Sequence, residues 1–203
     1  MRRLFMKLVL SLCLAVIAAV TLSGCTPIGV VVGGAAAAGV VVAEERSVGD
    51  AIEDAGIKLN IMNNLFEKSE TLFVDVSTSV IEGRVLVTGQ VQNPETRNSV
   101  ATTIWEVEGV NEVLNELQIS EKSGLTSATE DSWISAKLRS RLLQDIGIKH
   151  VNYSVDTVNR IVYLIGIAQN PEELERVYLH ARDVDGVRKI IHHVVMKDSR
   201  KTK

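Results

Sequence analysis

An internal repeat is the feature that most constrains the fold of this chain. The sequence matches itself at an offset of 77 residues, without gaps over most of two segments. Each copy spans about 70 residues, which is enough for one small hydrophobic core. The sequence therefore predicts two similar domains in tandem. The matched groups are Ile57, Ile61 and Leu65 with Ile134, Leu138 and Leu142; Gly89 with Gly166; Asn93-Pro94-Glu95 with Asn170-Pro171-Glu172; and Val107, Gly109 and Val110 with Val184, Gly186 and Val187.

The hydrophobic pattern of each copy predicts the order helix, strand, strand, helix, strand. An apolar residue every four positions indicates the first helix, and two β-type runs follow, joined by a turn at Glu82-Gly83 or Asn159-Arg160. Asn-Pro-Glu then begins a second helix, because Asn caps it and Pro suits its first position. That helix should stop near Gly109 or Gly186. We therefore expect an α+β fold with, in each copy, a three-stranded mixed sheet and two helices on one of its faces.

The N-terminus has the pattern of a secretory signal. Three basic residues precede the apolar run 8–20, which ends in Leu22-Ser23-Gly24-Cys25 and so matches the lipobox of bacterial lipoproteins. We expect residues 1–24 to be removed and Cys25 to carry the lipid; an uncleaved signal anchor is the alternative. Thr26, rather than Asp, implies sorting to the outer membrane. Cys13 lies in the removed part, so the mature chain should form no internal disulfide.

Composition and charge divide the rest of the chain. We expect an apolar tether over residues 25–46, copy 1 over 47–119, a linker rich in Ser, Thr and Gly over 120–130, copy 2 over 131–197 and a basic tail over 198–203. From Cys25 to Glu130 there are 6 basic and 16 acidic residues, a net charge of -10, whereas from Asp131 to Lys203 there are 13 basic and 9 acidic residues, a net charge of +4. Copy 2 is therefore the half suited to approach an anionic surface.

Short motifs in both copies resemble the BON domain. They are Val-Leu-Val-Thr-Gly at 85–89 with Val-Glu-Gly-Val at 107–110, and Val-Tyr-Leu-Ile-Gly at 162–166 with Val-Asp-Gly-Val at 184–187. From the lipobox to Met196 the chain resembles dual-BON-domain outer-membrane lipoproteins. The resemblance implies an acylated protein that faces the periplasm, supports envelope integrity and gathers at division sites. It also implies binding of phosphatidylglycerol and cardiolipin through the first helix of the second domain, and a link to the machinery that assembles outer-membrane β-barrels.

The first helix of copy 2 has a second apolar face. On a wheel of about 100° per residue, Trp133 and Leu143 lie opposite the core stripe, with one cation at each edge of that arc. Trp favours the boundary between headgroups and acyl chains, and flanking cations can reach lipid phosphates. The alternative is that Trp133 and Leu143 pack against copy 1 or the linker. The candidate phospholipid-binding residues are Trp133, Ala136, Lys137, Arg139, Ser140 and Leu143.

The same positions in copy 1 differ, and other candidate sites are weaker. Gly56 stands in place of Trp133, and Asn60 in place of Lys137. His192 and His193 are adjacent on a predicted strand, so they should point to opposite faces and should not share a metal ion. No nucleophile, base and orienting group have a recognisable spacing. We therefore expect no enzyme activity, metal, cofactor or nucleic-acid partner; the alternative to a lipid-binding protein is a protein-interaction adaptor.

Overall fold

The computed structural model describes residues 47–120 and 125–199. The predicted signal peptide, Cys25, the tether and the last four residues of the chain lie outside the described residues. Among the described residues, no helix combines the length and the hydropathy that crossing a membrane requires.

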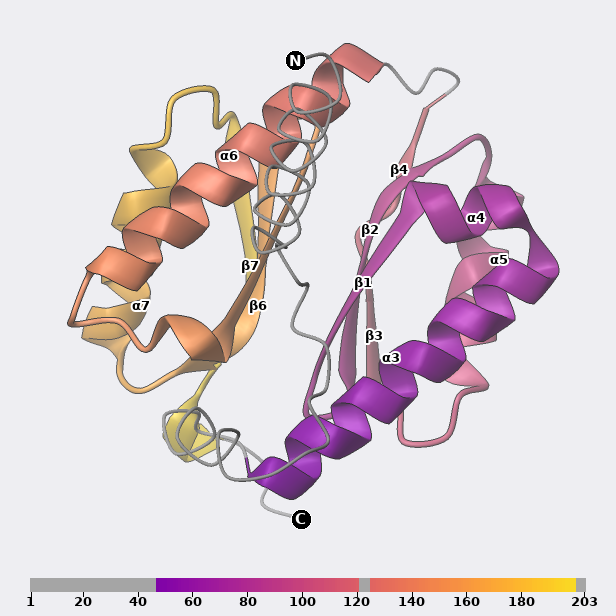
Figure 1. Ribbon diagram of the computed structural model, residues 1–203, viewed down its shortest axis with the longest axis horizontal. Helices are drawn as coiled ribbons and strands as arrows, with labels where there is room; N and C mark the ends of the chain where they lie inside the picture. The colour runs from indigo at the N-terminus through magenta and orange to yellow at the C-terminus, as the bar shows by residue number, and fades with distance from the viewer. Residues whose placement is uncertain (1–46, 121–124, 200–203) are drawn as a thin grey trace, which may run out of the picture. The chain divides into compact units, whose positions relative to one another are not determined.

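Each copy contains two long helices and a small sheet (Figure 1). Copy 1 consists of α3 (Val48–Lys68), α4 (Glu70–Asp75), β1 (Val76–Ile81), β2 (Arg84–Val91), α5 (Pro94–Trp105), β3 (Glu112–Asn115) and β4 (Gln118–Ile119). Copy 2 consists of α6 (Leu125–Gln144), the 3-10 turn η1 (His150–Asn152), β5 (Tyr153–Val158), β6 (Ile161–Ala168), α7 (Pro171–Arg182), β7 (Lys189–Met196) and the 3-10 turn η2 (Lys197–Ser199).

The repeat offset holds from element to element. Strands β5 and β6 and helix α7 begin and end 77 residues after β1, β2 and α5. Helix α6 likewise begins at Leu125, 77 residues after Val48, although composition alone predicted a linker as far as residue 130. The 77-residue offset therefore locates the start of α6 better than the Ser and Thr content of this segment does.

The two sheets have the predicted mixed topology. β1 pairs antiparallel with β2, and β2 pairs parallel with β3 and β4; β5, β6 and β7 repeat this arrangement with a continuous last strand. In copy 1, α3 and α5 lie on one face of their sheet, and in copy 2, α6 and α7 do the same (Figure 1). The α+β fold is confirmed, with the short helix α4 and the interrupted last strand of copy 1 as additions. The second helices end at Trp105 and Arg182, four residues before the glycines at which the sequence predicted their ends.

Both predicted hairpin turns form, and a buried carboxylate stabilises each one. Glu82, Gly83, Asn159 and Arg160 all have φ between 51° and 72°, as a two-residue type I′ turn requires. The Asp131 carboxylate accepts the backbone N–H groups of Asn159 and Arg160, both at 2.7 Å. Asp54 in α3 does the same for the turn of copy 1, at 2.8 and 2.9 Å. The first helix of each copy thus fixes the hairpin beneath it.

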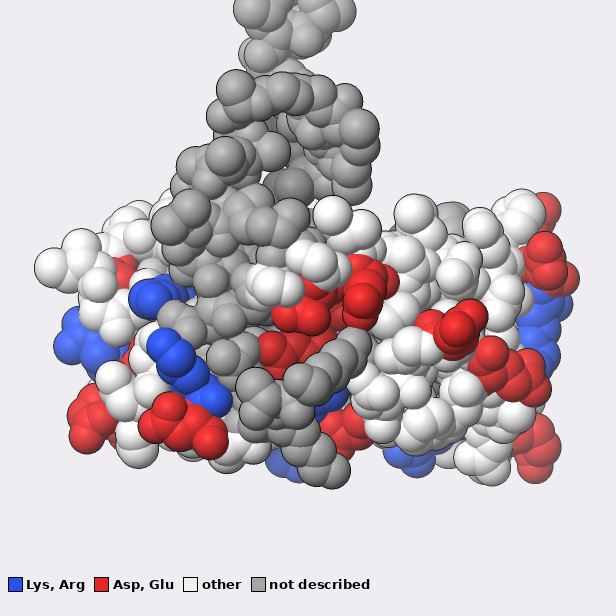
Figure 2. Space-filling model, turned by 90° about the horizontal axis from the view of Figure 1, so that it is seen from below, with Lys and Arg blue, Asp and Glu red and all other residues white. Residues whose placement is uncertain are grey.

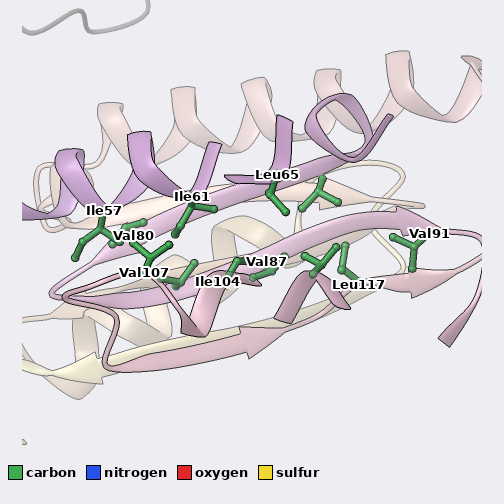
Figure 3. Close-up of a cluster of buried hydrophobic side chains, with 12 residues drawn as sticks. Ile57, Ile61, Leu65, Val80, Val87, Val91, Ile104, Val107 and Leu117 are labelled. Carbon is green, nitrogen blue, oxygen red and sulfur yellow. The ribbon is translucent and has the colours of Figure 1, made fainter. Parts of the chain in front are cut away.

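The core of copy 1 lies between its helices and its sheet. Ile57, Ile61 and Leu65 point from α3 towards Val87 of β2 and Ile104 of α5 (Figure 3). The equivalent core of copy 2 contains the α6 stripe, β5 and β6 residues, and residues of α7. Its buried members are Ile134, Leu138, Leu142, Ile148, Val155, Val162, Leu164, Val177, Ala181 and Val184.

A third cluster joins the opposite faces of the two sheets. Ile81 and Leu86 of copy 1 are buried together with Tyr163, Ile165 and other residues of copy 2. Hydrogen bonds surround this cluster: Ser79 to Ser154 at 2.8 Å, Gln118 Nε2 to the Tyr163 hydroxyl at 3.0 Å, and Thr88 to Asp156. Burial raises the pKa of Tyr163. Each sheet is therefore covered on both faces, which the hydrophobic repeat alone did not indicate.

Candidate functional site

Helix α6 presents the second apolar face that the sequence predicted. Its core stripe is buried, whereas Trp133 is 50% exposed and Leu143 is 61% exposed. Ala136 and Ser140, which lie between them on the wheel, are also exposed. Three and four residue steps along a helix place side chains on the same side, so these residues form one continuous strip on the surface of α6.

Lys137 lies directly over the indole of Trp133. Its ammonium nitrogen is 4.5 Å from the centroid of the ring, a distance at which the ring quadrupole attracts the cation. The same ammonium is 3.5 Å from the carboxylate of Asp185, which is 87% exposed. An exposed ion pair of this length contributes less than about 1 kcal/mol. Lys137 can therefore leave Asp185 for another anion at little cost.

Arg139 at the other edge of the strip is tethered to its own domain. Its guanidinium donates to the backbone carbonyl of Val155 in β5. Ser140 accepts a hydrogen bond of 3.0 Å from Gln144. The sequence predicted Arg139 as a cation equivalent to Lys137, but the structure uses one of its donors inside the domain. A guanidinium carries five N–H groups, so Arg139 has further donors with which to bind an anion.

A fully exposed isoleucine, which the helical periodicity did not predict, follows the helix. Ile146 lies in the turn after α6, three residues after Leu143, and lines a shallow hollow at the end of the helix together with Gln144. The turn is reinforced by Asp145, which accepts from Arg176 at 2.6 Å, from Gly147 at 2.9 Å and contacts His180 at 2.7 Å. The sequence does contain a signal for this exposure, because Ile146 stands between Asp145 and Gly147, two residue types that are common in surface turns.

The contacts of Asp145 also change its acidity. Hydrogen bonds from Arg176, His180 and the Gly147 backbone, together with the charge of Arg176, hold the pKa of Asp145 well below its ordinary value. The carboxylate is therefore ionised throughout the pH range in which the protein would work. Arg141, which the sequence placed at the border of the core stripe, donates towards the His180 carbonyl at 3.4 Å and faces α7.

The two adjacent histidines do not come together. His193 contacts Glu116 of copy 1 at 2.9 Å, whereas His192 lines a hollow between β7 and α7 with Tyr178 and Pro171. This is the opposite orientation that strand geometry predicts for neighbours. In residues 47–120 and 125–199 no group of three or more His, Cys, Asp or Glu side chains could hold a metal ion.

Comparison with known families identifies both halves of the chain. The BON domain model matches residues 53–121 and 130–198. The chain belongs to the BON-domain family. The two matches overlap the two copies of the repeat, so α3 and α6 are the first helices of BON domain 1 and BON domain 2.

Several relatives span most of the chain. It is 30% identical over 176 residues to an outer membrane lipoprotein named DolP of Haemophilus influenzae, covering 86% of this chain and 89% of the relative. It is 31% identical over 150 residues to a 21 kDa hemolysin of Actinobacillus pleuropneumoniae, with 73% and 76% covered. It is also 39% identical over 150 residues to an uncharacterised protein of Anaplasma centrale, with 73% and 98% covered.

Proposed function

We propose that this protein is an outer-membrane lipoprotein, acylated at Cys25 and facing the periplasm, whose second BON domain binds anionic phospholipid through α6. The observation that carries the proposal is a half-exposed Trp133 with the Lys137 ammonium 4.5 Å from its ring, on the same helix face as an exposed Leu143. Relatedness to a lipoprotein of the outer membrane supports the location. In the cell we expect the protein to act at the envelope, including division sites, in support of its integrity.

The strip on α6 has the chemistry of an interfacial helix. An indole ring favours the headgroup boundary, and Leu143 and Ile146 can enter the upper part of the acyl region. Small residues, Ala136 and Ser140, between the large ones let the helix lie close to the membrane surface. The helix axis would lie in the plane of the membrane, so that Trp133 and Leu143, which are 10 residues apart or about 15 Å along α6, reach it together.

Charge gives the preference for anionic headgroups such as phosphatidylglycerol and cardiolipin. Lys137 exchanges its weak pairing with Asp185 for a lipid phosphate, and Arg139 uses its remaining N–H groups at the other edge. Each cation close to an anionic membrane contributes about 1 kcal/mol, and the attraction is screened beyond about 10 Å at 0.1 M salt. Binding should therefore be modest and should weaken as salt is raised.

BON domain 1 does not have this combination at the equivalent helix. Gly56 occupies the place of Trp133 and Asn60 that of Lys137, so α3 has neither the indole nor the cation above it. The chain from Cys25 to Glu130 also has a net charge of -10, which opposes approach to an anionic membrane. This contrast supports the proposal that the second domain, rather than the first, binds lipid.

A lipid titration followed by residue-resolved NMR tests the proposal. Micelles of phosphatidylglycerol are added to the isotope-labelled protein, with phosphatidylcholine micelles as the control for headgroup charge. We expect shift changes confined to residues 131–147, largest at the indole N–H of Trp133, and only with phosphatidylglycerol. Equal shifts with both lipids, or shifts centred on another element, would contradict it.

A protein-interaction adaptor is the second candidate function, and the acidic surface of the first half of the chain favours it. On the face in Figure 2, Asp and Glu side chains are more prominent than Lys and Arg in the right half of the molecule, where copy 1 lies. Such a surface suits a basic partner, for which a component of the β-barrel assembly machinery is our candidate. Photo-crosslinking in cells from exposed acidic positions, such as Glu53 or Glu95, would give a discrete partner band for an adaptor and none for a protein that binds lipid alone.

A further inference from the structure

The outer face of α3 carries large apolar side chains at the spacing of a coiled-coil seam. Ile52 and Leu59 are 67% and 60% exposed, and Phe66, a further seven residues on, is about half exposed. Ala55 and Met62, which occupy the intervening positions three residues after Ile52 and Leu59, are partly exposed. These five residues, named the α3 seam here, follow the alternating three and four residue spacing by which two helices pack together.

The α3 seam is separate from the core of its own domain. The core stripe of α3 is Ile57, Ile61 and Leu65, on the opposite side of the helix. A surface helix of a single domain needs one apolar stripe, whereas α3 has two. The α3 seam therefore fits a partner outside the domain, because leaving Ile52 and Leu59 in water contributes nothing to the fold.

Gly56 gives an independent indication that another helix approaches. It lies inside α3 next to Ala55, where glycine disfavours the helix by about 1 kcal/mol relative to alanine. A Cβ atom at Gly56 would meet no heavy atom within 4 Å among residues 47–120 and 125–199, so packing within this part of the chain does not require the glycine. A missing side chain at the edge of an exposed seam lets a second backbone come close, as small residues do at helix interfaces.

From these observations we infer that the α3 seam is a self-association surface, occupied by α3 of a second copy of this chain. The residues that flank it are Ala51, Gly56, Lys58 and Asn63, none of them acidic. Two copies can therefore pair along it without bringing carboxylates together, although the first half of the chain is strongly acidic. Glu53 and Glu67 lie one position further out, towards solvent.

Neither a lipid surface nor a basic partner matches the α3 seam as well. Lys58 is the one cation among its flanking residues, so the α3 seam lacks the several basic residues that attract a helix to an anionic membrane. A basic partner would require acidic residues beside the seam, and they stand outside it. A twofold pair is isologous, so each apolar residue of one copy meets the same surface of the other. Leu59, midway between Ile52 and Phe66, would lie near the twofold axis in a parallel or an antiparallel pair.

The area available for pairing is small, so the dimer should be weak in solution. A stable interface buries about 800 Å² on each partner, more than a seam of five side chains can supply. Confinement of copies to one membrane raises their effective concentration and would increase pairing there without any new contact.

Cysteine crosslinking tests the seam directly. The chain is expressed from its full sequence, reconstituted in phosphatidylcholine vesicles, and oxidised after Leu59→Cys or, as the matched control one position outside the seam, Asn60→Cys. We expect Leu59→Cys to form a crosslinked dimer at least tenfold faster than Asn60→Cys. Equal rates would overturn the proposal, because random collision on the vesicle does not distinguish the two positions.

Two further variants separate association from folding. Gly56→Gln should raise the Tm, since glutamine favours a helix over glycine and the space around Gly56 is open, yet it should slow crosslinking at Leu59→Cys several-fold. In sedimentation equilibrium, Leu59→Glu should raise the dimer dissociation constant at least tenfold while the Tm stays within a few degrees. Unchanged association in both variants would refute the seam, as would crosslinks from Leu59→Cys to another protein alone. Neither variant should alter binding to phosphatidylglycerol, so failure here is distinct from failure of the lipid site.

Discussion

Replacing Trp133 by Glu should remove most of the membrane affinity and leave the fold intact. A tryptophan buries about 150–250 Å² when it leaves water, and half of Trp133 is exposed in this structure. About 100 Å² is thus available to the membrane, worth about 2.5 kcal/mol at about 25 cal/mol per Å². That corresponds to about a 60-fold loss of partitioning, and the new carboxylate near an anionic surface increases the loss further.

The chain contains its own control for this substitution. Trp105, the only other tryptophan in the sequence, lies at the end of α5 in BON domain 1 and is 53% exposed. Trp105→Glu makes the same chemical change at equal exposure. Co-sedimentation with vesicles containing phosphatidylglycerol gives the partition coefficient of each variant, and thermal unfolding shows whether each one is folded.

The comparison of the two variants decides whether the reasoning holds. We expect Trp133→Glu to lose vesicle binding and Trp105→Glu to keep it, with Tm values close to that of the unaltered protein. If both variants bound vesicles as well as the unaltered protein does, the assignment of α6 as the membrane-facing helix would be refuted. Equal losses would mean that any exposed aromatic serves, and the particular arrangement around Lys137 would then have no special role.

The other predictions concern the charges around α6. Asp185→Asn should strengthen vesicle binding about twofold to fivefold, measured by co-sedimentation, because it frees Lys137 from a weak ion pair; weaker binding would show that the pair positions Lys137 instead. Asp131→Ala should lower the free energy of unfolding by about 2 kcal/mol or more in urea titrations, because two turn N–H groups lose their acceptor, and an unchanged midpoint would argue against this role. The pKa of Asp145 is held below its ordinary value of 3.8, so its contribution to stability is complete above that pH and is lost as pH falls through the lowered pKa. Asp145→Asn should therefore be less stable at pH 7 and should lose less further stability between pH 4 and pH 2, as urea titrations at each pH would show.

The sequence predicted which face of α6 is exposed, but it did not predict the contacts that the side chains on this face make. Helical periodicity alone distinguished the core stripe from the face of Trp133 and Leu143, because the angular position of a residue on a helix depends only on its place in the local sequence. The ties of Lys137 to Asp185 and of Arg139 to Val155 join residues 48 and 16 positions apart, and periodicity contains no information on them. The exposure of Ile146 depends on how Arg176 and His180 of α7 hold the preceding turn.

The sequence by itself determined the two copies, their element order, the positions of the two hairpin turns and the capped second helices. These follow from short-range rules: the hydrophobic period, the Asn-Pro-Glu caps, and one turn-forming residue in each hairpin, Gly83 or Asn159. Only the tertiary structure decided that the outer faces of the two sheets bury Leu86 and Tyr163 in one cluster, and that α3 keeps a second apolar stripe in solvent. An alternating or heptad pattern shows that a face is apolar, but what covers it depends on residues that are distant in the chain.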